Sequence, residues 1–182
     1  LSGFLLDDDM SDTLVIAITQ SGTTTDTNRA VTLARSRGAR LIAIVNRRQS
    51  DITTKVHGVF YTSDGRDVEM SVASTKAFYS QIAAGYVLAL FFAQLTRTLD
   101  DGCIAENLRR LEDAPGLMAR VIGQREAIGK TAWDVLRRKQ YWAVVGSGIN
   151  KVASDEVRIK LSELCYKTIS SDIIEDKKHI DL

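Results

Sequence analysis

The sequence predicts an α/β protein with parallel strands, from two features of its first third. Residues 14–19 (LVIAIT) and 41–46 (LIAIVN) are short apolar runs rich in β-branched side chains, as in strands buried within a sheet. Between them, residues 26–37 carry apolar side chains at helical spacing, and Gly38 suits the position after a helix C-terminus. A strand, helix and strand in this order form a parallel pair joined by a right-handed crossover.

The remaining elements repeat this pattern after a helical middle. They are, in order, a short strand at residues 58–62, a long helix at 74–98, helical stretches at 104–112 and 115–138, a strand at 141–145 (YWAVV), a tight turn at 146–148 and a helix at 150–167. Pro115 suits a first helical turn, where its missing N–H costs nothing. Two strand-to-helix units separated by helices therefore indicate two lobes, the second of them incomplete.

Composition excludes several classes of function. The 182 residues carry 24 Lys and Arg against 23 Asp and Glu, a net charge of +1, which gives no basic surface for nucleic acid or anionic membrane. Cys103 and Cys165 have no metal-binding spacing, and His57 and His179 are the two histidines. We therefore expect a reducing, cytoplasmic setting, no disulfide, no metal and no cofactor.

An uncharged stretch at residues 77–95 approaches the length of a membrane span. Ser80, Gln81, Gly85 and Gln94 interrupt it, and no second such stretch follows. We expect a helix buried on nearly all sides, in a protein core or a subunit interface, rather than a membrane helix.

The loop at residues 20–25 (QSGTTT) joins the first predicted strand to its helix. Such loops bind anions in α/β proteins, because free backbone N–H groups and the positive end of the helix dipole meet there. Gly22 permits close approach of the backbone. Hydroxyl donors without positive charge come from Ser21, Thr23, Thr24 and Thr25. The pattern fits a sugar phosphate better than ATP, since the lysine of a nucleotide-binding P-loop is absent. A hydroxyl-rich helix cap that binds nothing fits the spacing equally well.

A second candidate group lies on the helix at residues 150–167. Glu156, Lys160, Glu163 and Lys167 follow one another at steps of four, three and four, so they share one face of that helix. By periodicity alone this is a solvated face with weak ion pairs. A carboxylate beside an ammonium group can also move a proton and stabilise an oxyanion, as ketose–aldose isomerisation requires.

Two segments resemble a known family. Residues 18–27 (ITQSGTTTDT) resemble the phosphate-binding motif of sugar isomerase (SIS) domains, and residues 71–78 (SVASTKAF) are similar to the isomerase half of glutamine:fructose-6-phosphate aminotransferases. The resemblance implies a three-layer α/β/α fold with a parallel sheet, and a homodimer. It divides the chain into a first SIS lobe at residues 1–100, a helical spacer at 101–139 and the start of a second SIS lobe at 140–182.

The resemblance also assigns roles to residues. It implies phosphate contacts and sugar contacts by Thr19, Gln20, Ser21, Thr24, Val72, Ser74 and Glu69. Thr19 stands where the family usually has Ser, and Thr23 where these aminotransferases commonly have Glu. Residues 156–166 (EVRIKLSELCY) are similar to the catalytic helix of the second lobe, which implies Lys160 beside the reacting carbon and Glu163 as the base.

His179 matches the family's ring-opening histidine, which acts in the neighbouring subunit. Two departures accompany these matches: Ser162 replaces a usual Lys, and Ile180-Asp181 replaces the usual Gly-Pro.

The resemblance implies conversion of fructose 6-phosphate to glucosamine 6-phosphate. The aminotransferases also need a glutaminase domain, expected in the full-length chain, and a lysine in a C-terminal tail. These 182 residues include neither, so by themselves they should not aminate a sugar. Two alternatives stay open: an isomerase or deaminase for another phosphosugar, and a non-catalytic phosphosugar sensor.

Overall fold

A computed structural model describes residues 9–65 and 73–180 of the chain. The chain divides into two compact units, Leu1–Leu111 and Glu112–Leu182.

The first unit contains a three-stranded parallel sheet in the order β1-β2-β3. Its strands are β1 (Leu14–Thr19), β2 (Arg40–Val45) and β3 (Gly58–Tyr61), with Leu14 opposite Arg40 and Ile42 opposite Gly58. All three were predicted from their apolar runs. Because the strands are parallel, their carboxyl ends meet at one edge, where α/β proteins place ligand sites.

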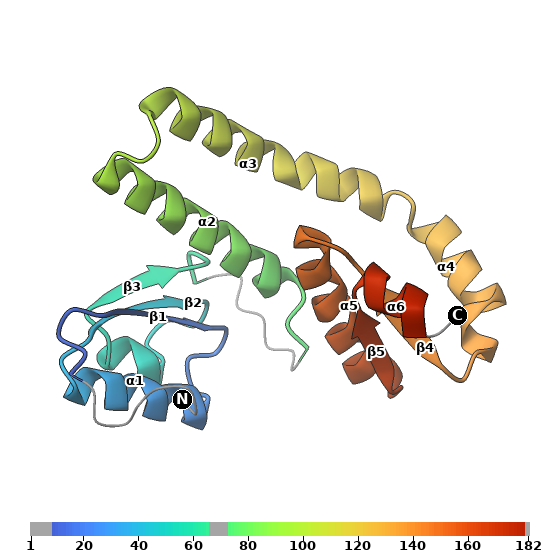
Figure 1. Cartoon of the computed structure of the whole chain (residues 1–182), viewed down its shortest axis with the longest axis horizontal. Helices are drawn as coiled ribbons and strands as arrows, with labels where there is room; N and C mark the ends of the chain where they lie inside the picture. The colour runs from blue at the N-terminus through green and yellow to red at the C-terminus, as the bar shows by residue number, and fades with distance from the viewer. Residues whose placement is uncertain (1–8, 66–72, 181–182) are drawn as a thin grey trace. The chain divides into compact units, whose positions relative to one another are not determined.

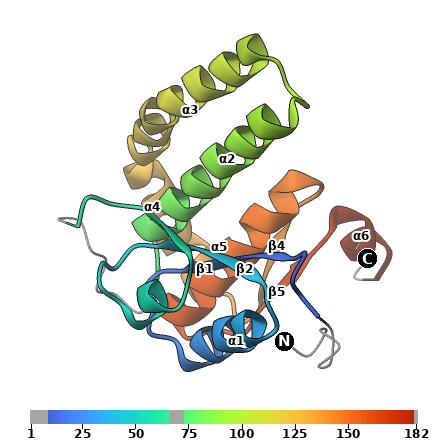
Figure 2. The same cartoon turned by 90° about the vertical axis from the view of Figure 1, so that its left-hand side faces the viewer.

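Helices cover both faces of this sheet. Figures 1 and 2 place α1 (Thr25–Ser36) and α2 (Lys76–Thr96) on opposite sides, so this unit has three layers. On the α1 side, Val31 packs with Leu41 and Val45, together with Ile52 from a 3₁₀ turn, η1 (Asp51–Thr54). Strand residues alternate between faces, so Ile44 is buried on the α2 side.

The end of α1 follows the predicted cap. Gly38 has φ +92°, and its N–H donates to the Arg35 carbonyl at 3.0 Å, while the Ala39 N–H donates to the Ala34 carbonyl at 3.1 Å. A residue in this left-handed region is favoured as glycine, because it has no Cβ to clash with the preceding turn.

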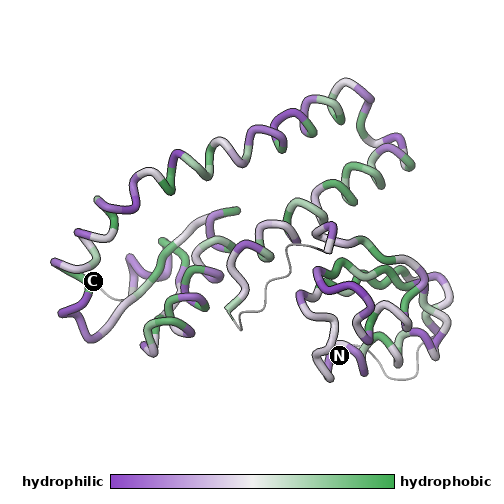
Figure 3. The backbone as a smooth tube through the Cα atoms, turned by 180° about the vertical axis from the view of Figure 1, so that it is seen from behind, coloured by the Kyte–Doolittle hydropathy of each residue, from purple (hydrophilic) through white to green (hydrophobic). Residues whose placement is uncertain are grey.

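The long apolar helix is less buried within the chain than expected. Ala77, Ala84 and Leu90 of α2 are buried, whereas other large side chains are exposed, among them Tyr79, Ile82, Tyr86, Phe91 and Leu95. Within this single chain burial on nearly all sides is therefore not found, whereas burial in a subunit interface stays a prediction. Figure 3 shows hydrophobic positions recurring along this helix. Among the described residues, α2 is also the helix whose length and apolar composition would allow a membrane crossing.

The second unit contains a two-stranded parallel sheet and helices. The elements from the boundary onward are α3 (Asp101–Ile122), which carries the boundary itself, α4 (Arg125–Asp134), η2 (Leu136–Arg138), β4 (Trp142–Val145), α5 (Ile149–Cys165), β5 (Ile169–Asp172) and α6 (Ile174–Ile180). β4 pairs with β5, with Trp142 opposite Ile169. The predicted strand, glycine turn and helix at residues 141–167 are confirmed.

The helical middle differs from the prediction in one respect. Pro115 lies inside α3 and not in a first turn, so α3 runs through it at the cost of one backbone hydrogen bond. The break comes after Ile122 instead. β5 and α6 were not predicted, because the ISSD sequence of β5 lacks an apolar run and forms a strand only by pairing with β4.

Candidate functional site

The loop after β1 takes a sharp turn that requires glycine. Gly22 has φ +68°, and a Cβ placed there would lie 2.2 Å from Ser50 Oγ and 2.9 Å from a methyl carbon of Ile52. The loop backbone therefore packs directly against the start of η1. The Ile52 N–H fixes this approach by donating to the Gly22 carbonyl at 3.1 Å.

The predicted phosphate-contact residues come together in this loop. The Thr19 hydroxyl is buried and accepts a hydrogen bond from the Gly22 N–H at 3.2 Å. The Ser21 and Thr23 hydroxyls lie 2.9 Å apart, and Ser21 Oγ accepts the Thr23 N–H at 3.3 Å. The Gln20 carbonyl accepts hydrogen bonds from the backbone N–H groups of the two residues that follow β2, Asn46 and Arg47. Thr19 and Gln20 thus anchor the loop, while Ser21 and Thr23 gather hydroxyl groups on it.

The loop ends at the N-terminus of α1 with Thr24 as its cap residue. Thr24 is exposed, and its side chain makes no capping hydrogen bond. The first amides of a helix lack intrahelical acceptors and carry the positive end of the dipole. The Thr24 hydroxyl therefore does not cap α1, as it would if the loop were only a hydroxyl-rich helix cap. The arrangement can hold an anion with neutral donors.

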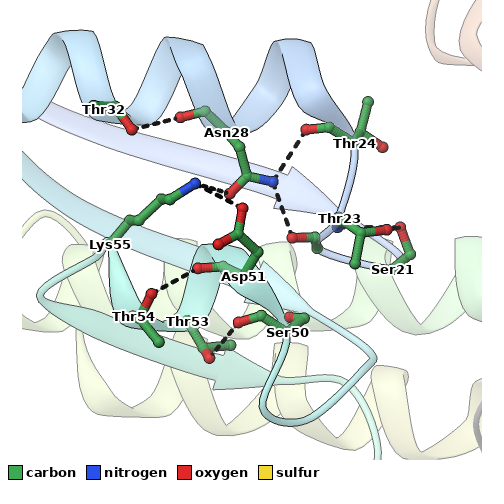
Figure 4. Close-up of polar contacts among 11 residues, drawn as sticks. Ser21, Thr23, Thr24, Asn28, Thr32, Ser50, Asp51, Thr53, Thr54 and Lys55 are labelled. Atoms are coloured by element: carbon green, nitrogen blue, oxygen red, sulfur yellow. Dashed lines mark hydrogen bonds and ion pairs between the residues drawn. The ribbon is translucent and has the colours of Figure 1, made fainter.

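Sequence reasoning missed a buried polar group behind the loop, drawn in Figure 4. The Asn28 amide nitrogen donates to the Gly22 carbonyl at 3.0 Å and to the Thr24 carbonyl at 3.1 Å. The Asn28 oxygen accepts from Lys55 Nζ at 3.0 Å, and Lys55 also pairs with Asp51 at 2.7 Å. The sequence does show an Asn about one turn after the predicted start of the helix. It does not show that this Asn contacts Lys55, which lies 27 residues further along the chain.

The predicted sugar-contact residues are described in part. Ser74 lies between β3 and α2, and its Oγ is buried with no hydrogen-bond partner among the residues that the structure describes. A buried hydroxyl without a partner is costly, so a hydrogen-bonding group at this position would be stabilising. Glu69 and Val72 lie outside the described residues.

The predicted catalytic pair meets on α5. Lys160 Nζ lies 3.0 Å from Glu163 Oε2 and 3.3 Å from Glu156 Oε1. Burial alone lowers the pKa of Lys160, but the hydrogen bonds to Glu163 and Glu156 outweigh it and raise the pKa above its ordinary value. Lys160 is therefore a stable cation at neutral pH, held between two carboxylates.

The candidate residues fall into two groups in different units. The loop and Ser74 belong to the first unit, whereas Lys160 and Glu163 belong to the second. His179 is exposed on α6, also in the second unit. Within residues 9–65 and 73–180, no cluster of His, Cys, Asp or Glu has a metal-binding arrangement.

Comparison with known proteins identifies relatives of the chain. Residues 8–91 match the family model of the SIS domain. Glutamine–fructose-6-phosphate aminotransferase (isomerizing) of Streptomyces coelicolor is 36% identical over 167 residues, which are 92% of this chain and 27% of the relative. The enzyme of the same name from Mycobacterium tuberculosis is 38% identical over 169 residues, 92% of this chain and 26% of the relative. The chain thus spans about a quarter of the length of these relatives.

Solved structures agree on the fold. The C-terminal domain of glucosamine-fructose-6-phosphate aminotransferase from Francisella tularensis superimposes with a TM-score of 0.85 at 27% identity, covering 91% of this chain and 46% of that one. Tagatose-6-phosphate ketose/aldose isomerase from Escherichia coli gives a TM-score of 0.61 at 17% identity, covering 92% and 44%. The second likeness bears on the fold alone.

Proposed function

Because residues 8–91 of this chain match the SIS domain family, we propose that the chain binds the phosphate of a hexose 6-phosphate. Gln20, Ser21 and Thr24 are the proposed phosphate contacts. The observation that carries this proposal is the loop itself, in which hydroxyls and amides gather where β1 meets α1. Thr19 supports them from beneath through its bond to the Gly22 N–H.

Neutral donors are sufficient for this task. A hydrogen bond to a charged oxygen contributes about 1.5–3 kcal/mol, so three or four of them stabilise a bound phosphate even after the cost of desolvation. The positive end of the α1 dipole adds to this without a lysine.

The sugar is proposed to lie beside the phosphate, in contact with Val72, Ser74 and Glu69. The buried Ser74 hydroxyl, which has no partner among the described residues, supports this part of the proposal, because a sugar hydroxyl would supply a hydrogen bond. In the chain Ser74 lies between β3 and α2, two residues before that helix begins.

The proposed chemistry is ketose–aldose isomerisation of the phosphosugar. Glu163 would take a proton from one of the carbons C1 and C2 and return it to the other, while the Lys160 ammonium stabilises the enediolate oxygen. Their 3.0 Å contact supports a shared task. His179 is proposed to open the sugar ring, from the neighbouring subunit of a homodimer.

The full proposal is a glucosamine-6-phosphate synthase-like protein of the cytoplasm. It would use fructose 6-phosphate in amino sugar biosynthesis, with a glutaminase domain supplying ammonia. The names of the aminotransferases that match most of this chain support it. Thr23 and Ser162 depart from the aminotransferase pattern, so another phosphosugar isomerase or deaminase is the alternative, and a non-catalytic sensor is a third.

Thermal unfolding with added fructose 6-phosphate tests the phosphate site. We expect the ligand to raise the melting temperature of the chain and Ser21→Ala to remove most of that rise. Ser36→Ala is the matched control, because the Ser36 hydroxyl bonds the Leu33 carbonyl at the other end of α1. A rise that persists undiminished in Ser21→Ala would refute the phosphate assignment.

Proton exchange tests the catalytic part. In the protein that carries this chain, Glu163→Gln should leave fructose 6-phosphate binding intact and abolish exchange of the sugar's C1 or C2 proton with solvent. Exchange retained in Glu163→Gln would exclude Glu163 as the base. Binding with no exchange in the unaltered protein would favour the sensor.

A further inference from the structure

We propose that Asn28, held by Lys55, is a positioning residue that turns two backbone N–H groups of the loop toward the phosphate. This inference rests on the proposed phosphate site and adds a residue that no part of that proposal includes. Asn28 is 4% exposed and points away from the helix axis into the back of the loop, as Figure 4 shows.

The geometry of the peptide bond carries the argument. In a planar trans peptide unit the C=O and the N–H point in opposite directions. Asn28 binds the carbonyls of Gly22 and Thr24 on one side of the loop. The N–H groups of the same two peptide units belong to Thr23 and Thr25, so they face the other side.

The Thr23 N–H points toward the hydroxyl groups of the loop. The Thr23 N–H donates to Ser21 Oγ, and Ser21 Oγ is in turn within 2.9 Å of the Thr23 hydroxyl. The hydroxyls and the amide therefore share one side of the loop. Together with the Ile52 N–H on the Gly22 carbonyl and its own backbone N–H on the Thr24 carbonyl, the Asn28 amide keeps two carbonyl oxygens, which would repel a phosphate, on the opposite side.

Lys55 fixes which end of the Asn28 amide faces the loop. Its ammonium group can only donate, so it selects the Asn28 oxygen and leaves the NH₂ group for the two carbonyls. Asp51 holds Lys55 in place by accepting a hydrogen bond of 2.7 Å. A charged donor on the oxygen also polarises the amide and strengthens its two N–H bonds.

Two substitutions separate these contributions. Asn28→Asp keeps an oxygen for Lys55 but replaces the NH₂ group with a second oxygen. This oxygen should repel the Gly22 and Thr24 carbonyls that the amide attracts. Lys55→Met keeps the Asn28 amide and removes what orients it. Thr32→Val is the matched control, because the Thr32 hydroxyl bonds the Asn28 backbone carbonyl on α1 without reaching the loop.

The experiment is calorimetric titration of the chain with fructose 6-phosphate and, separately, inorganic phosphate, at a temperature where every variant is folded. We expect Asn28→Asp to weaken both ligands by the same factor, about tenfold or more. Lys55→Met should weaken both by a smaller factor, and Thr32→Val should leave both unchanged. Equal loss for both ligands locates the defect at the phosphate and not at the sugar.

The outcomes separate this inference from the proposed function. If the unaltered chain binds neither ligand, the proposed function fails and the inference with it. If the unaltered chain binds and folded Asn28→Asp binds equally well, the inference alone is wrong.

A measurement on the unaltered chain covers the case in which Asn28→Asp does not fold. Inorganic phosphate should then move the NMR signals of the Thr23 and Thr25 amide protons downfield. Signals that stay unmoved while phosphate binds would overturn the inference.

Discussion

Gly22 and Ser50 approach so closely that a Cβ on Gly22 would lie 2.2 Å from the Ser50 hydroxyl oxygen. This contact joins the loop after β1 to the residue that precedes η1, two segments far apart in sequence. The loop backbone therefore packs tightly against this residue, and the Ile52 N–H also donates a hydrogen bond to the Gly22 carbonyl. The loop is therefore shaped before any ligand arrives, which lowers the entropy lost on binding.

Gly22→Ala should destabilise the chain by roughly 1–3 kcal/mol from the left-handed φ alone, and by more from the contact with Ser50. Urea unfolding measures the loss. Gly129→Ala is the matched control, since Gly129 lies inside α4 with no atom within 4 Å of the added Cβ. The control should stabilise the chain by about 0.5–1 kcal/mol, because alanine favours helix. A harmless Gly22→Ala would contradict the observed loop conformation.

Pro115→Ala tests whether α3 is continuous. Inside a helix, proline removes a backbone hydrogen bond and crowds the carbonyl four residues earlier, at a cost of about 3 kcal/mol. Replacing it should therefore stabilise the chain by roughly 1–3 kcal/mol and raise the melting temperature followed by circular dichroism. Gly116→Ala, at the next residue of α3, should stabilise by less, about 1 kcal/mol. If Pro115 began a separate helix, as the sequence indicated, Pro115→Ala would not stabilise the chain.

The pH dependence of Lys160 follows from its raised pKa. Because the folded-state pKa lies above the ordinary value of 10.5, folding favours the protonated form. The stabilisation is fully present below 10.5 and is lost as the pH rises through the folded pKa. It should be about 1 kcal/mol or less, since the pair is partly exposed.

An NMR titration of the Lys160 side chain checks this. The midpoint should lie above the ordinary lysine value of 10.5. Glu163→Gln should lower the Lys160 midpoint, because the charge on one hydrogen-bond acceptor is lost. A midpoint that does not move in Glu163→Gln would show that the contact contributes nothing in solution.

The fold of the first unit was predictable because its signals are local. Apolar runs of four to six residues fall in β1, β2 and β3, and Gly38 follows α1 at the position that a left-handed residue must take. β5 was not predictable in this way, since the polar side chains of Ser170, Ser171 and Asp172 carry no strand pattern. Its pairing with β4 decides its conformation.

The candidate site divides in the same way. Ser21, Thr23 and Thr24 were visible as a hydroxyl-rich loop between a strand and a helix, and Lys160 and Glu163 as neighbours on a helix face. Ser74 was reached by resemblance, and only the structure shows that its hydroxyl lacks a partner among the described residues.

The sequence by itself therefore determined the parallel strands, the loop and the spacing of the charged helix face, because each depends on residues within a few positions of one another. Only the tertiary structure decided that Asn28 and Lys55 meet behind the loop and that Ser50 closes against Gly22. Those contacts join separate segments of chain. They form only when packing of Ile52, Leu41 and Val31 in a common core brings η1, β2 and α1 together.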